Sequence, residues 1–381
     1  MKSNKKVKVL HVLAGMDLGG IETFLMNVFR NIDKQKVQFD FALSTLEECY
    51  YNNEIRELGG NIYKLNHPKT SLKLYKNQLE NIIEENGPYD VIHSHSYLFN
   101  GFVMSIGKKK SIKTRISHSH TIEDNKGKTF NLKRLFYRSF MKYLIKRNTT
   151  HFFGCTKEAH ESLHGTKIPK KKVEILKNGI NLNDYSKISE TEKNNIQKEL
   201  DIPNNAVVMG HIGRFSPVKN HTFILDVFKA LLEKKNDNYY LLLIGEGKLL
   251  PDIKEKAKEM GLLNNIRFLG LRKDIPQLLS FIDYFIFPSI YEGLGISLIE
   301  AQASGKNCII SENIPSESII VEELVSVKKL SESPYDWANT IKSTITKATS
   351  DTNAKNKVRR KGYDINAVCE LLEKKYYVKF E

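Results

Sequence analysis

Cysteine, long apolar runs and repeated segments are all scarce in this chain of 381 residues. The cysteines are scattered and form no CxxC pair, a pattern typical of reduced thiols in a cytosolic protein rather than of a disulfide framework. They are Cys49, Cys155, Cys308 and Cys369. No run approaches the ~18 apolar residues that a transmembrane helix needs. The short apolar run at 7–13 lacks the longer apolar core of a signal peptide, so we expect a first β-strand there and a cytoplasmic protein.

Acidic residues are also in short supply, because 59 Lys and Arg face 44 Asp and Glu and leave a formal net charge of +15. Such an excess implies an anionic partner: nucleic acid, a phosphorylated substrate or an acidic membrane surface. The basic residues do not gather into a recognised nucleic-acid-binding motif, so we expect no nucleic-acid partner.

The order of predicted elements indicates an α/β protein with two doubly wound, Rossmann-like domains. Short apolar strands alternate with helix-length stretches, and the alternation begins again after a polar segment at 185–205. We therefore predict domains at 1–190 and 191–364, followed by a helical stretch at 365–381. Because open parallel sheets bind ligands at the carboxyl ends of their strands, motifs at strand ends in a cleft between the domains are the candidates for function. The predicted strands are 7–13, 39–43, 91–96, 114–120, 151–155, 173–178, 207–213, 239–245, 266–270, 284–289 and 307–311.

The first candidate is GMDLGGIETF, which follows the first predicted strand and opens a helix. Gly19 and Gly20 let a ligand approach the backbone, and unpaired helix amides attract an anion. The stretch is not GxGxxG, so a nicotinamide or flavin site is not supported. An ordinary turn between strand and helix explains the glycines equally well.

The second candidate, HIGRFSPVKNH, follows the first strand of the second domain. After Gly213, Arg214 offers a rigid fork of donors and Lys219 a mobile point charge, which together suit a diphosphate. A solvated basic loop is the plainer alternative in a chain so rich in lysine.

The third candidate is YEGLGISLIE, in which two acids flank a glycine pair at the start of a helix. The segment Gly293, Leu294 and Gly295 exposes helix amides, while Glu292 and Glu300 can accept hydrogen bonds from sugar hydroxyls. A capped helix with a surface acid is the alternative.

Two HxH elements form the fourth candidate, His93 with His95 and His118 with His120. Residues i and i+2 of a strand face the same side, so metal ligation is conceivable. No cysteine or carboxylate cluster accompanies them, and we favour histidines that pack in the core or contact a substrate over a zinc site.

Taken together, these motifs resemble the retaining, family-4-type glycosyltransferases of the GT-B fold. FPSIYEGLGISLIEAQASG, GRFSPVKN, IRFLGLRKDIPQLL, VEILKNGINLNDY and the N-terminal GGIE each look like a segment of that family, over about residues 7–380. Three departures stand out. Asn181 replaces the usual Asp, ENIPSES replaces a glycine-rich turn near Glu317, and no DxD triad is present.

The resemblance implies a role for each matched residue. Catalytic roles fall to His118, Arg214, Lys219 and Glu292, and donor binding to Gly19, Gly20, Gly213, Arg272, Gly293, Leu294, Gly295 and Glu300. Within that scheme Glu292 contacts the donor sugar, Glu300 the ribose diol, and Arg272 borders the base. His95 and His120 are candidates on the acceptor side, and His120 competes with His118 for the catalytic position.

The implied reaction transfers a sugar, with retention, from a nucleotide diphosphate sugar to an acceptor hydroxyl. The resemblance favours uridine as the base and implies neither metal nor cofactor, since basic residues neutralise the leaving diphosphate. It also implies a C-terminal helix that crosses back to the N-terminal domain.

The basic amphipathic stretch 131–147 is typical of binding to an anionic membrane surface. It favours a lipid-linked saccharide acceptor, as in capsular or exopolysaccharide synthesis at the inner face of the cell membrane. A packed helix with a solvated basic face is the alternative.

Two other functions fit the same fold. A nucleotide-sugar epimerase would bind the same donor without an acceptor, and a non-catalytic partner subunit would keep the fold without the chemistry. The glutamate pair of the third motif favours transfer, and the presence of all the expected donor-site residues argues against the partner subunit.

Overall fold

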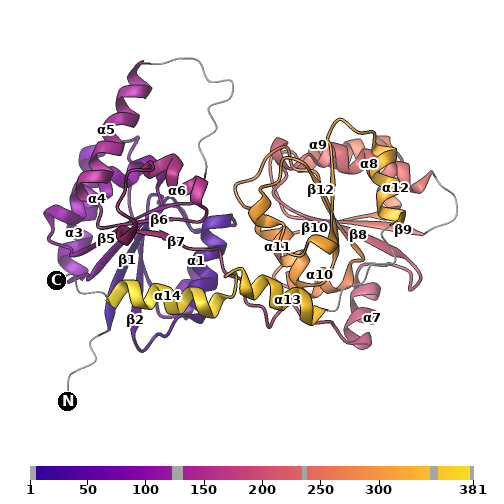
Figure 1. The fold of residues 1–381 in the computed structure, drawn as a ribbon, viewed down its shortest axis with the longest axis horizontal. Helices are drawn as coiled ribbons and strands as arrows, with labels where there is room; N and C mark the ends of the chain where they lie inside the picture. Colours follow the sequence, from indigo (N-terminus) through magenta and orange to yellow (C-terminus); the bar gives the residue numbers. More distant parts are fainter. Residues whose placement is uncertain (1–5, 122–131, 234–237, 344–350, 378–381) are drawn as a thin grey trace. The chain divides into compact units, whose positions relative to one another are not determined.

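The computed structural model describes residues 6–121, 132–233, 238–343 and 351–377, and the chain divides into two compact units (Figure 1). Unit 1 comprises Met1–Ile180 and Gly362–Glu381, and unit 2 comprises Asn181–Lys361. The first unit is therefore discontinuous in sequence. The division lies about ten residues before the boundary predicted near residue 190. It falls within the NGIN segment at 178–181, between Ile180 and Asn181.

Unit 1 is built on a seven-stranded parallel sheet in the order β3-β2-β1-β4-β5-β6-β7. Its strands are β1 (Val7–Leu13), β2 (Val37–Leu43), β3 (Asn61–Lys64), β4 (Val91–Ser94), β5 (Thr114–Ser119), β6 (His151–Gly154) and β7 (Val173–Ile175). The residues of β1, β2, β4, β5 and β6 are nearly all buried, as expected for a sheet covered on both faces.

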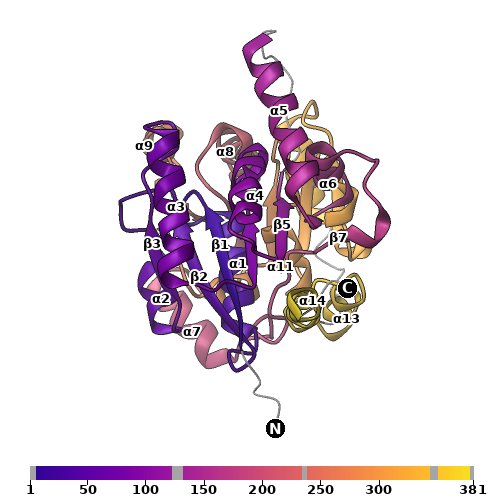
Figure 2. The same ribbon diagram turned by 90° about the vertical axis from the view of Figure 1, so that its left-hand side faces the viewer.

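Helices cover both faces of that sheet (Figure 2). Apolar side chains of α1 and α14 pack with one set of strand residues, and those of α3 and α4 pack with the alternate set. The helices are α1 (Gly20–Asn31), α2 (Asn52–Glu57), α3 (Leu72–Asn86), α4 (Asn100–Lys109), α5 (Leu132–Asn148), α6 (Lys157–His164) and α14 (Ile365–Tyr377). The C-terminal helix α14 thus belongs to unit 1 and completes its core.

Unit 2 repeats the architecture with a six-stranded parallel sheet in the order β10-β9-β8-β11-β12-β13. Its strands are β8 (Val207–Ile212), β9 (Tyr239–Ile244), β10 (Ile266–Gly270), β11 (Tyr284–Phe287), β12 (Asn307–Ser311) and β13 (Val325–Lys328). Its helices are α7 (Glu190–Glu199), α8 (His221–Leu232), α9 (Leu250–Glu259), α10 (Ile275–Phe281), α11 (Ile296–Ala303), α12 (Pro334–Ser343) and α13 (Asp351–Arg360). Its core joins the apolar sides of α8, α9 and α12 to the central strands.

The predicted α/β class and the two doubly wound sheets are confirmed. Two edge strands, β3 and β13, were not predicted, because each is short and only half-buried. The segment 185–205 is also more ordered than its polar composition suggested, since α7 begins there with a capping box between Ser189 and Glu192.

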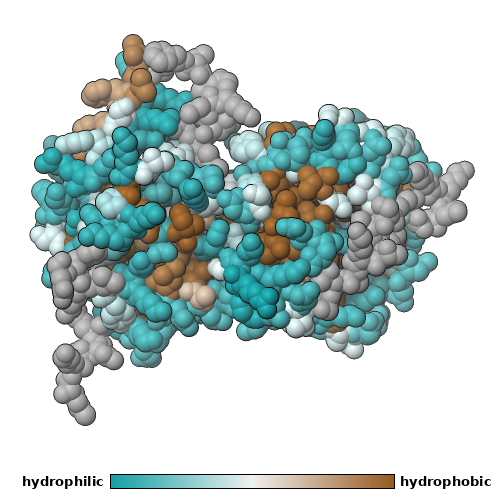
Figure 3. Space-filling model, in the orientation of Figure 1, coloured by the Kyte–Doolittle hydropathy of each residue, from teal (hydrophilic) through white to brown (hydrophobic). Residues whose placement is uncertain are grey.

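Helix α5 extends beyond the body of unit 1 at its N-terminal end (Figure 1). Met141 and Ile145 are buried against the unit, whereas the first nine residues of the helix contain no buried side chain. Large apolar side chains are therefore exposed near that end, where Figure 3 shows hydrophobic atoms on the projecting helix. They are Leu132, Leu135, Phe136, Tyr137, Phe140 and Tyr143. Within the described ranges, no helix combines the length and the apolar character needed to cross a membrane.

Candidate functional site

The motif residues of unit 2 gather at the carboxyl edge of its sheet. Strand β8 ends at Ile212, and the chain then passes through Gly213 and Arg214 to the short turn that carries Lys219. The Lys219 side chain passes close to Gly213: a Cβ placed on that glycine would lie 2.8 Å from His211 Nε2 and 3.2 Å from Lys219 Cδ. A side chain at 213 would therefore clash with the buried His211 ring and crowd the lysine. Arg214 is exposed at the same edge.

Lys219 is held by two contacts from the strand β11 side. Its Nζ donates a hydrogen bond to Glu292 Oε1 at 2.6 Å and lies 4.6 Å from the ring centre of Phe287. Both ionic side chains are largely withdrawn from solvent, with 18% and 12% of their surface exposed. The two residues that the sequence assigned to different motifs are thus direct partners, and the pair fixes the position of the ammonium group.

The loop after β11 leads into helix α11, and the residue at the start of that helix must be glycine. Gly295 has φ +71°, and a Cβ there would also approach Phe287 at 3.2 Å. Helix α11 has no side-chain N-cap, so its first amides are not satisfied in that way. Leu294 is buried, and its carbonyl accepts a hydrogen bond from Ser318. Gly293 lies between this anchored segment and Glu292.

Glu300 sits on α11 and has a partner that the sequence did not reveal. The hydroxyl of Tyr185, itself 6% exposed, donates to Glu300 Oε1 at 2.7 Å. Desolvation raises the pKa of Glu300 to about 7, and the hydrogen bond from Tyr185 acts in the opposite direction. The carboxyl group is therefore poised to change charge near neutral pH.

Arg272 follows β10 at the same edge, but its guanidinium is already engaged. It donates to both carboxylate oxygens of Asp274, at 2.8 and 2.7 Å, and to Glu199 at 2.5 Å. These hydrogen bonds raise the pKa of Arg272 above its usual value. The Arg272 side chain therefore ties the loop after β10 to Glu199 of α7.

The loop Gly245-Glu246-Gly247 after β9 was not singled out from the sequence. Gly245 has φ +135°, and a Cβ there would lie 2.3 Å from the carbonyl oxygen of Gly213. The amide of Phe215 donates to the Glu246 carbonyl at 2.9 Å. The two loops therefore lie against each other, and only glycine permits that approach. The signal was present as a GxG at a strand end, but Gly245 was read as the last residue of the strand 239–245 and Gly247 was not considered.

In unit 1, Gly19 and Gly20 lie where β1 leads into α1. Gly19 is the N-cap in an extended conformation and offers no side-chain cap. A Cβ on Gly20 would meet no atom within 4 Å, so the backbone at the start of α1 is open on that side. Local packing therefore does not explain why this position is glycine.

The second feature of unit 1 is a histidine cluster near the carboxyl ends of β1, β4 and β5. It joins both predicted HxH elements to a fifth histidine that the sequence reading missed, and its members are His11, His93, His95, His118 and His120. Val9 of β1, Val91 of β4 and Ile116 of β5 face the core that α1 and α14 cover. The histidines come two or four residues later on the same strands or just beyond them, so they face the same side of the sheet.

Two hydrogen-bonded chains run through the cluster. In one, His11 Nδ1 lies 3.1 Å from His95 Nε2, and His95 Nδ1 lies 2.8 Å from His120 Nε2. In the other, Tyr376 of α14 contacts His93, which in turn contacts His118. Burial lowers the pKa of every member, to about 3 for His11 and His120 and well below the usual value for the others. The rings are therefore neutral at physiological pH.

Some nitrogens of the cluster have no hydrogen-bond partner within the described part of the chain. They are His11 Nε2, His118 Nε2 and His120 Nδ1. Two triplets, His11/His93/His95 and His95/His118/His120, also bring one nitrogen per ring within 4.8 Å of one another. Three neutral imidazoles can hold a transition metal, although most of these nitrogens are already used in ring-to-ring contacts.

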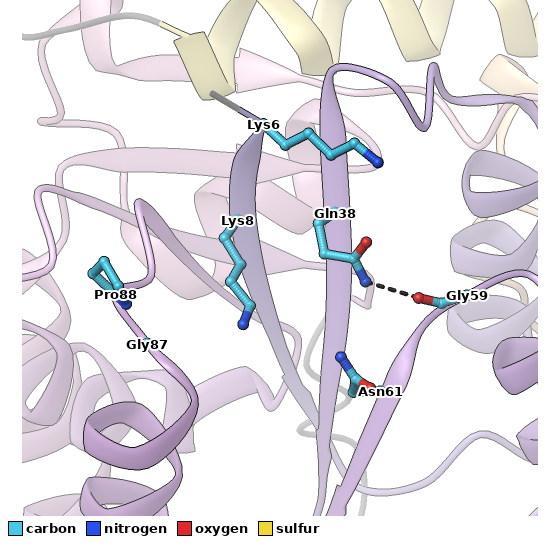
Figure 4. A pocket seen from close by; sticks show the side chains of 7 residues that line it. All are labelled: Lys6, Lys8, Gln38, Gly59, Asn61, Gly87 and Pro88. Carbon is cyan, nitrogen blue, oxygen red and sulfur yellow. Dashed lines mark hydrogen bonds between the residues drawn. The ribbon is translucent and has the colours of Figure 1, made fainter. Parts of the chain in front are cut away.

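Unit 1 also has a hollow, at the opposite edge of its sheet from Gly19, Gly20 and the histidine cluster. It has a volume of about 470 Å³ and is lined at the amino ends of the first strands by Lys6, Lys8, Gln38, Gly59, Asn61, Gly87 and Pro88 (Figure 4). Gln38 closes one side by donating to the Gly59 carbonyl at 2.8 Å. Ligands of open parallel sheets bind at the opposite, carboxyl edge, so this hollow is not the candidate site.

Comparison with known proteins settles the family. The profile "Glycosyl transferases group 1" matches residues 192–364, and "Glycosyltransferase Family 4" matches residues 18–184. The putative glycosyltransferase EpsF of Bacillus subtilis is 36% identical over 346 residues, which are 90% of this chain and 88% of that protein. The chain belongs to the group 1, family 4 glycosyltransferases.

Further relatives agree with this assignment. This glycosyltransferase is 28% identical to the capsular polysaccharide biosynthesis glycosyltransferase CapH of Staphylococcus aureus, over 98% of this chain and 99% of that one. It is 26% identical to an Escherichia coli UDP-Gal:alpha-D-GlcNAc-diphosphoundecaprenol alpha-1,3-galactosyltransferase, over 84% of each. The crystal structure of Anabaena HepE with UDP and glucose superposes with a TM-score of 0.78 at 18% identity, over 97% and 98% of the two chains. That likeness confirms the GT-B fold.

Proposed function

We propose that this glycosyltransferase moves a sugar, with retention, from a uridine diphosphate sugar to a hydroxyl of a lipid-linked saccharide during synthesis of a surface polysaccharide. The observation that carries the proposal is the grouping of Lys219, Glu292, the start of α11 and Glu300 at one edge of the unit 2 sheet. A cation, open helix amides and a carboxyl group suit a diphosphate, its sugar and a ribose diol respectively.

The chemical role of these groups follows from the charge that develops as the sugar leaves. Arg214, Lys219 and the first amides of α11 stabilise the departing diphosphate, and each preorganised donor of this kind contributes about 2.7–4 kcal/mol. Glu292 holds the lysine in place and contacts the donor sugar. Since these donors neutralise the leaving group, we propose that the reaction needs no metal, and that activity persists in EDTA.

The residues of unit 1 complete the proposal. Gly19 and Gly20 give the diphosphate access to the backbone, and His118 contacts the reacting sugar. His95 and His120 lie on the acceptor side. Names of relatives support the choice of substrates, because CapH is named for capsular polysaccharide biosynthesis and the E. coli relative for a UDP-sugar and a diphosphoundecaprenol acceptor.

The donor site is tested by measuring binding and slow hydrolysis of a panel of nucleotide sugars. One donor should bind and release nucleotide, and Lys219→Met should lower its turnover by about 10²–10³-fold. Lys256→Met is the matched control, because Lys256 pairs with Asp226 at 3.1 Å on the surface of the same unit and should leave turnover unchanged. Failure of every donor to bind would favour a non-catalytic partner subunit. Interconversion of the donor without an acceptor would favour an epimerase.

We further propose that the exposed end of α5 anchors the enzyme at the cytoplasmic face of the membrane. Leu132, Leu135, Phe136, Phe140 and Tyr143 recur at helical spacing and are 47–75% exposed. An apolar row beside basic residues suits insertion among anionic lipid headgroups.

Vesicle co-sedimentation tests this anchor. The enzyme should bind vesicles that contain anionic phospholipid, and Phe136→Ser with Phe140→Ser should abolish binding. Leu263→Ser, which alters a 43% exposed leucine of unit 2, should have no effect. Equal binding by all variants, or none by the unaltered enzyme at moderate salt, would remove support for the membrane proposal and leave the donor site untouched.

A further inference from the structure

The donor-site proposal leaves one buried group unexplained, the hydroxyl of Tyr376 on the C-terminal helix α14. This tyrosine is 3% exposed, and its hydroxyl oxygen lies 3.0 Å from His93 Nδ1. His93 Nε2 lies 3.2 Å from His118 Nδ1. His93 and His118 are 1% and 0% exposed, so the chain of three side chains is shielded from water. It ends at His118 Nε2, which has no hydrogen-bond partner in the described part of the structure.

The direction of the protons along this chain can be worked out. Each buried imidazole is neutral and carries one ring proton. If the Tyr376 hydroxyl donates to His93 Nδ1, the proton of His93 must be on Nε2, from which it is donated to His118 Nδ1. The proton of His118 must then be on Nε2.

The opposite direction is less favourable. It would make His93 Nδ1 donate to the Tyr376 oxygen, and the phenol proton would then lack an acceptor among the described residues. His118 Nε2 would be unsatisfied as well, so two buried polar groups would be unpaired instead of one. Each such group costs about 1–3 kcal/mol. Burial also raises the pKa of Tyr376 well above its usual value, which keeps the phenol protonated and able to donate.

We propose that Tyr376 is a positioning residue that acts through His93 to hold His118 in the tautomer with its proton on Nε2. His118 then carries a hydrogen-bond donor at the end of β5, and because the ring is 0% exposed, a ligand oxygen reaches Nε2 only when the residues that cover it move aside. Since Nε2 of His118 carries the proton in this tautomer, it can donate a hydrogen bond but cannot accept one. The site therefore favours a ligand oxygen that accepts a hydrogen bond, either a hydroxyl or a negatively charged oxygen. This inference rests on the proposed function only for the identity of that oxygen, which we assign to the donor sugar.

The second chain of the cluster serves as an internal comparison. His11, His95 and His120 are linked in the same way, but no tyrosine ends their chain, and both terminal nitrogens are unpaired in either direction. Its protons have no comparable preference for one direction. A fixed tautomer is therefore expected for His118 and not for His120.

The test reads the tautomers directly, by long-range proton–nitrogen correlation spectra of the full chain with ¹⁵N-labelled histidine. His118→Gln and His120→Gln identify the signals. The unaltered enzyme should show His118 protonated at Nε2. Tyr376→Phe should give a mixture of His118 tautomers while the apolar ring keeps its place in the core. Tyr377→Phe is the matched control, since that neighbouring hydroxyl donates to the Lys36 carbonyl at 2.9 Å and should leave the His118 signal unchanged.

Donor turnover supplies a second readout. Loss of the fixed tautomer lowers the competent fraction, so Tyr376→Phe should reduce kcat/KM by about 2–10-fold. An Nδ1-protonated His118 in the unaltered enzyme, or an unchanged signal in Tyr376→Phe, would overturn the inference. So would a stoichiometric metal bound to the purified protein, because coordination would replace the ring proton. If no nucleotide sugar binds but the tautomer behaves as stated, the proposed function fails and the positioning role stands.

Discussion

The hydrogen bond from Tyr185 to Glu300 allows a quantitative prediction about nucleotide binding. A hydrogen bond to a charged group contributes about 1.5–3 kcal/mol, and 1.36 kcal/mol corresponds to one pKa unit. Tyr185→Phe removes a 2.7 Å bond that lowers the pKa of Glu300, which stands at about 7. The variant should therefore titrate about one to two units higher.

The consequence for binding follows from the fraction of Glu300 that is ionised. In the proposed function the Glu300 carboxylate accepts both hydrogen bonds of the ribose diol, so the affinity for the nucleotide should rise with pH through about 7 in the unaltered enzyme. At pH 7 the ionised fraction falls from about one half to about a tenth or a hundredth in Tyr185→Phe, and affinity should fall by about 5–50-fold. Raising the pH to about 9 should restore most of the lost affinity of Tyr185→Phe.

Calorimetric titration of UDP between pH 6 and 9 measures this effect. The 2′,3′-dideoxy analogue is the reference, because it has the same diphosphate but no diol and should show no Glu300-dependent rise. Tyr335→Phe is the matched control: it removes another tyrosine-to-glutamate hydrogen bond, to Glu233 on the surface of unit 2. The same pH profile in Tyr185→Phe as in the unaltered enzyme would refute the assignment of Glu300 to the diol.

Three further predictions concern stability and backbone access. The folded-state pKa of His11 and His120 is about 3, below the usual 6.5, so their contribution to the free energy of unfolding should be complete above pH 6.5. The free energy of unfolding should fall by about 1.4 kcal/mol per pH unit for each such histidine as the pH decreases toward 3. A thermal midpoint that stays constant down to pH 5 would contradict this. Gly245→Ala should destabilise unit 2, seen as a lower midpoint by fluorescence of its single tryptophan, Trp337, whereas Gly261→Ala, also at positive φ but in open space, should cost less. Gly20→Ala should leave the melting temperature unchanged or raise it, yet weaken donor binding; a lower melting temperature with normal binding would mean that the glycine serves the turn.

The sequence predicted the elements of the fold well, because central strands and long amphipathic helices have strong periodic patterns. It failed at β3 and β13, where a short strand at the edge of a sheet buries too little to show a pattern. Helix α7 was missed for a related reason: its composition is polar, and only two of its residues are buried.

The candidate site was predicted residue by residue but not as a set of contacts. Each motif pointed to a strand end, yet nothing in the spacing indicated that Lys219 and Glu292 pair directly. Tyr185 lies in a polar segment and Tyr376 stands 283 residues from His93, so neither had a local signal. Such partners become visible only when the fold has brought distant segments together.

The discontinuity of unit 1 has a consequence for how the enzyme is made. Ile180 and the segment before α14 are joined by reciprocal backbone hydrogen bonds: the Ile180 amide donates to the Tyr363 carbonyl, and the Ile365 amide donates to the Ile180 carbonyl. During translation, the first domain to leave the ribosome must wait for all of unit 2 before α14 can close its core. A ribosome that stops early therefore releases a chain that lacks Tyr376 and exposes apolar surface to proteases. The same adjacency means that a short peptide joining Ile180 to Gly362 should yield unit 1 as a single, continuous gene product.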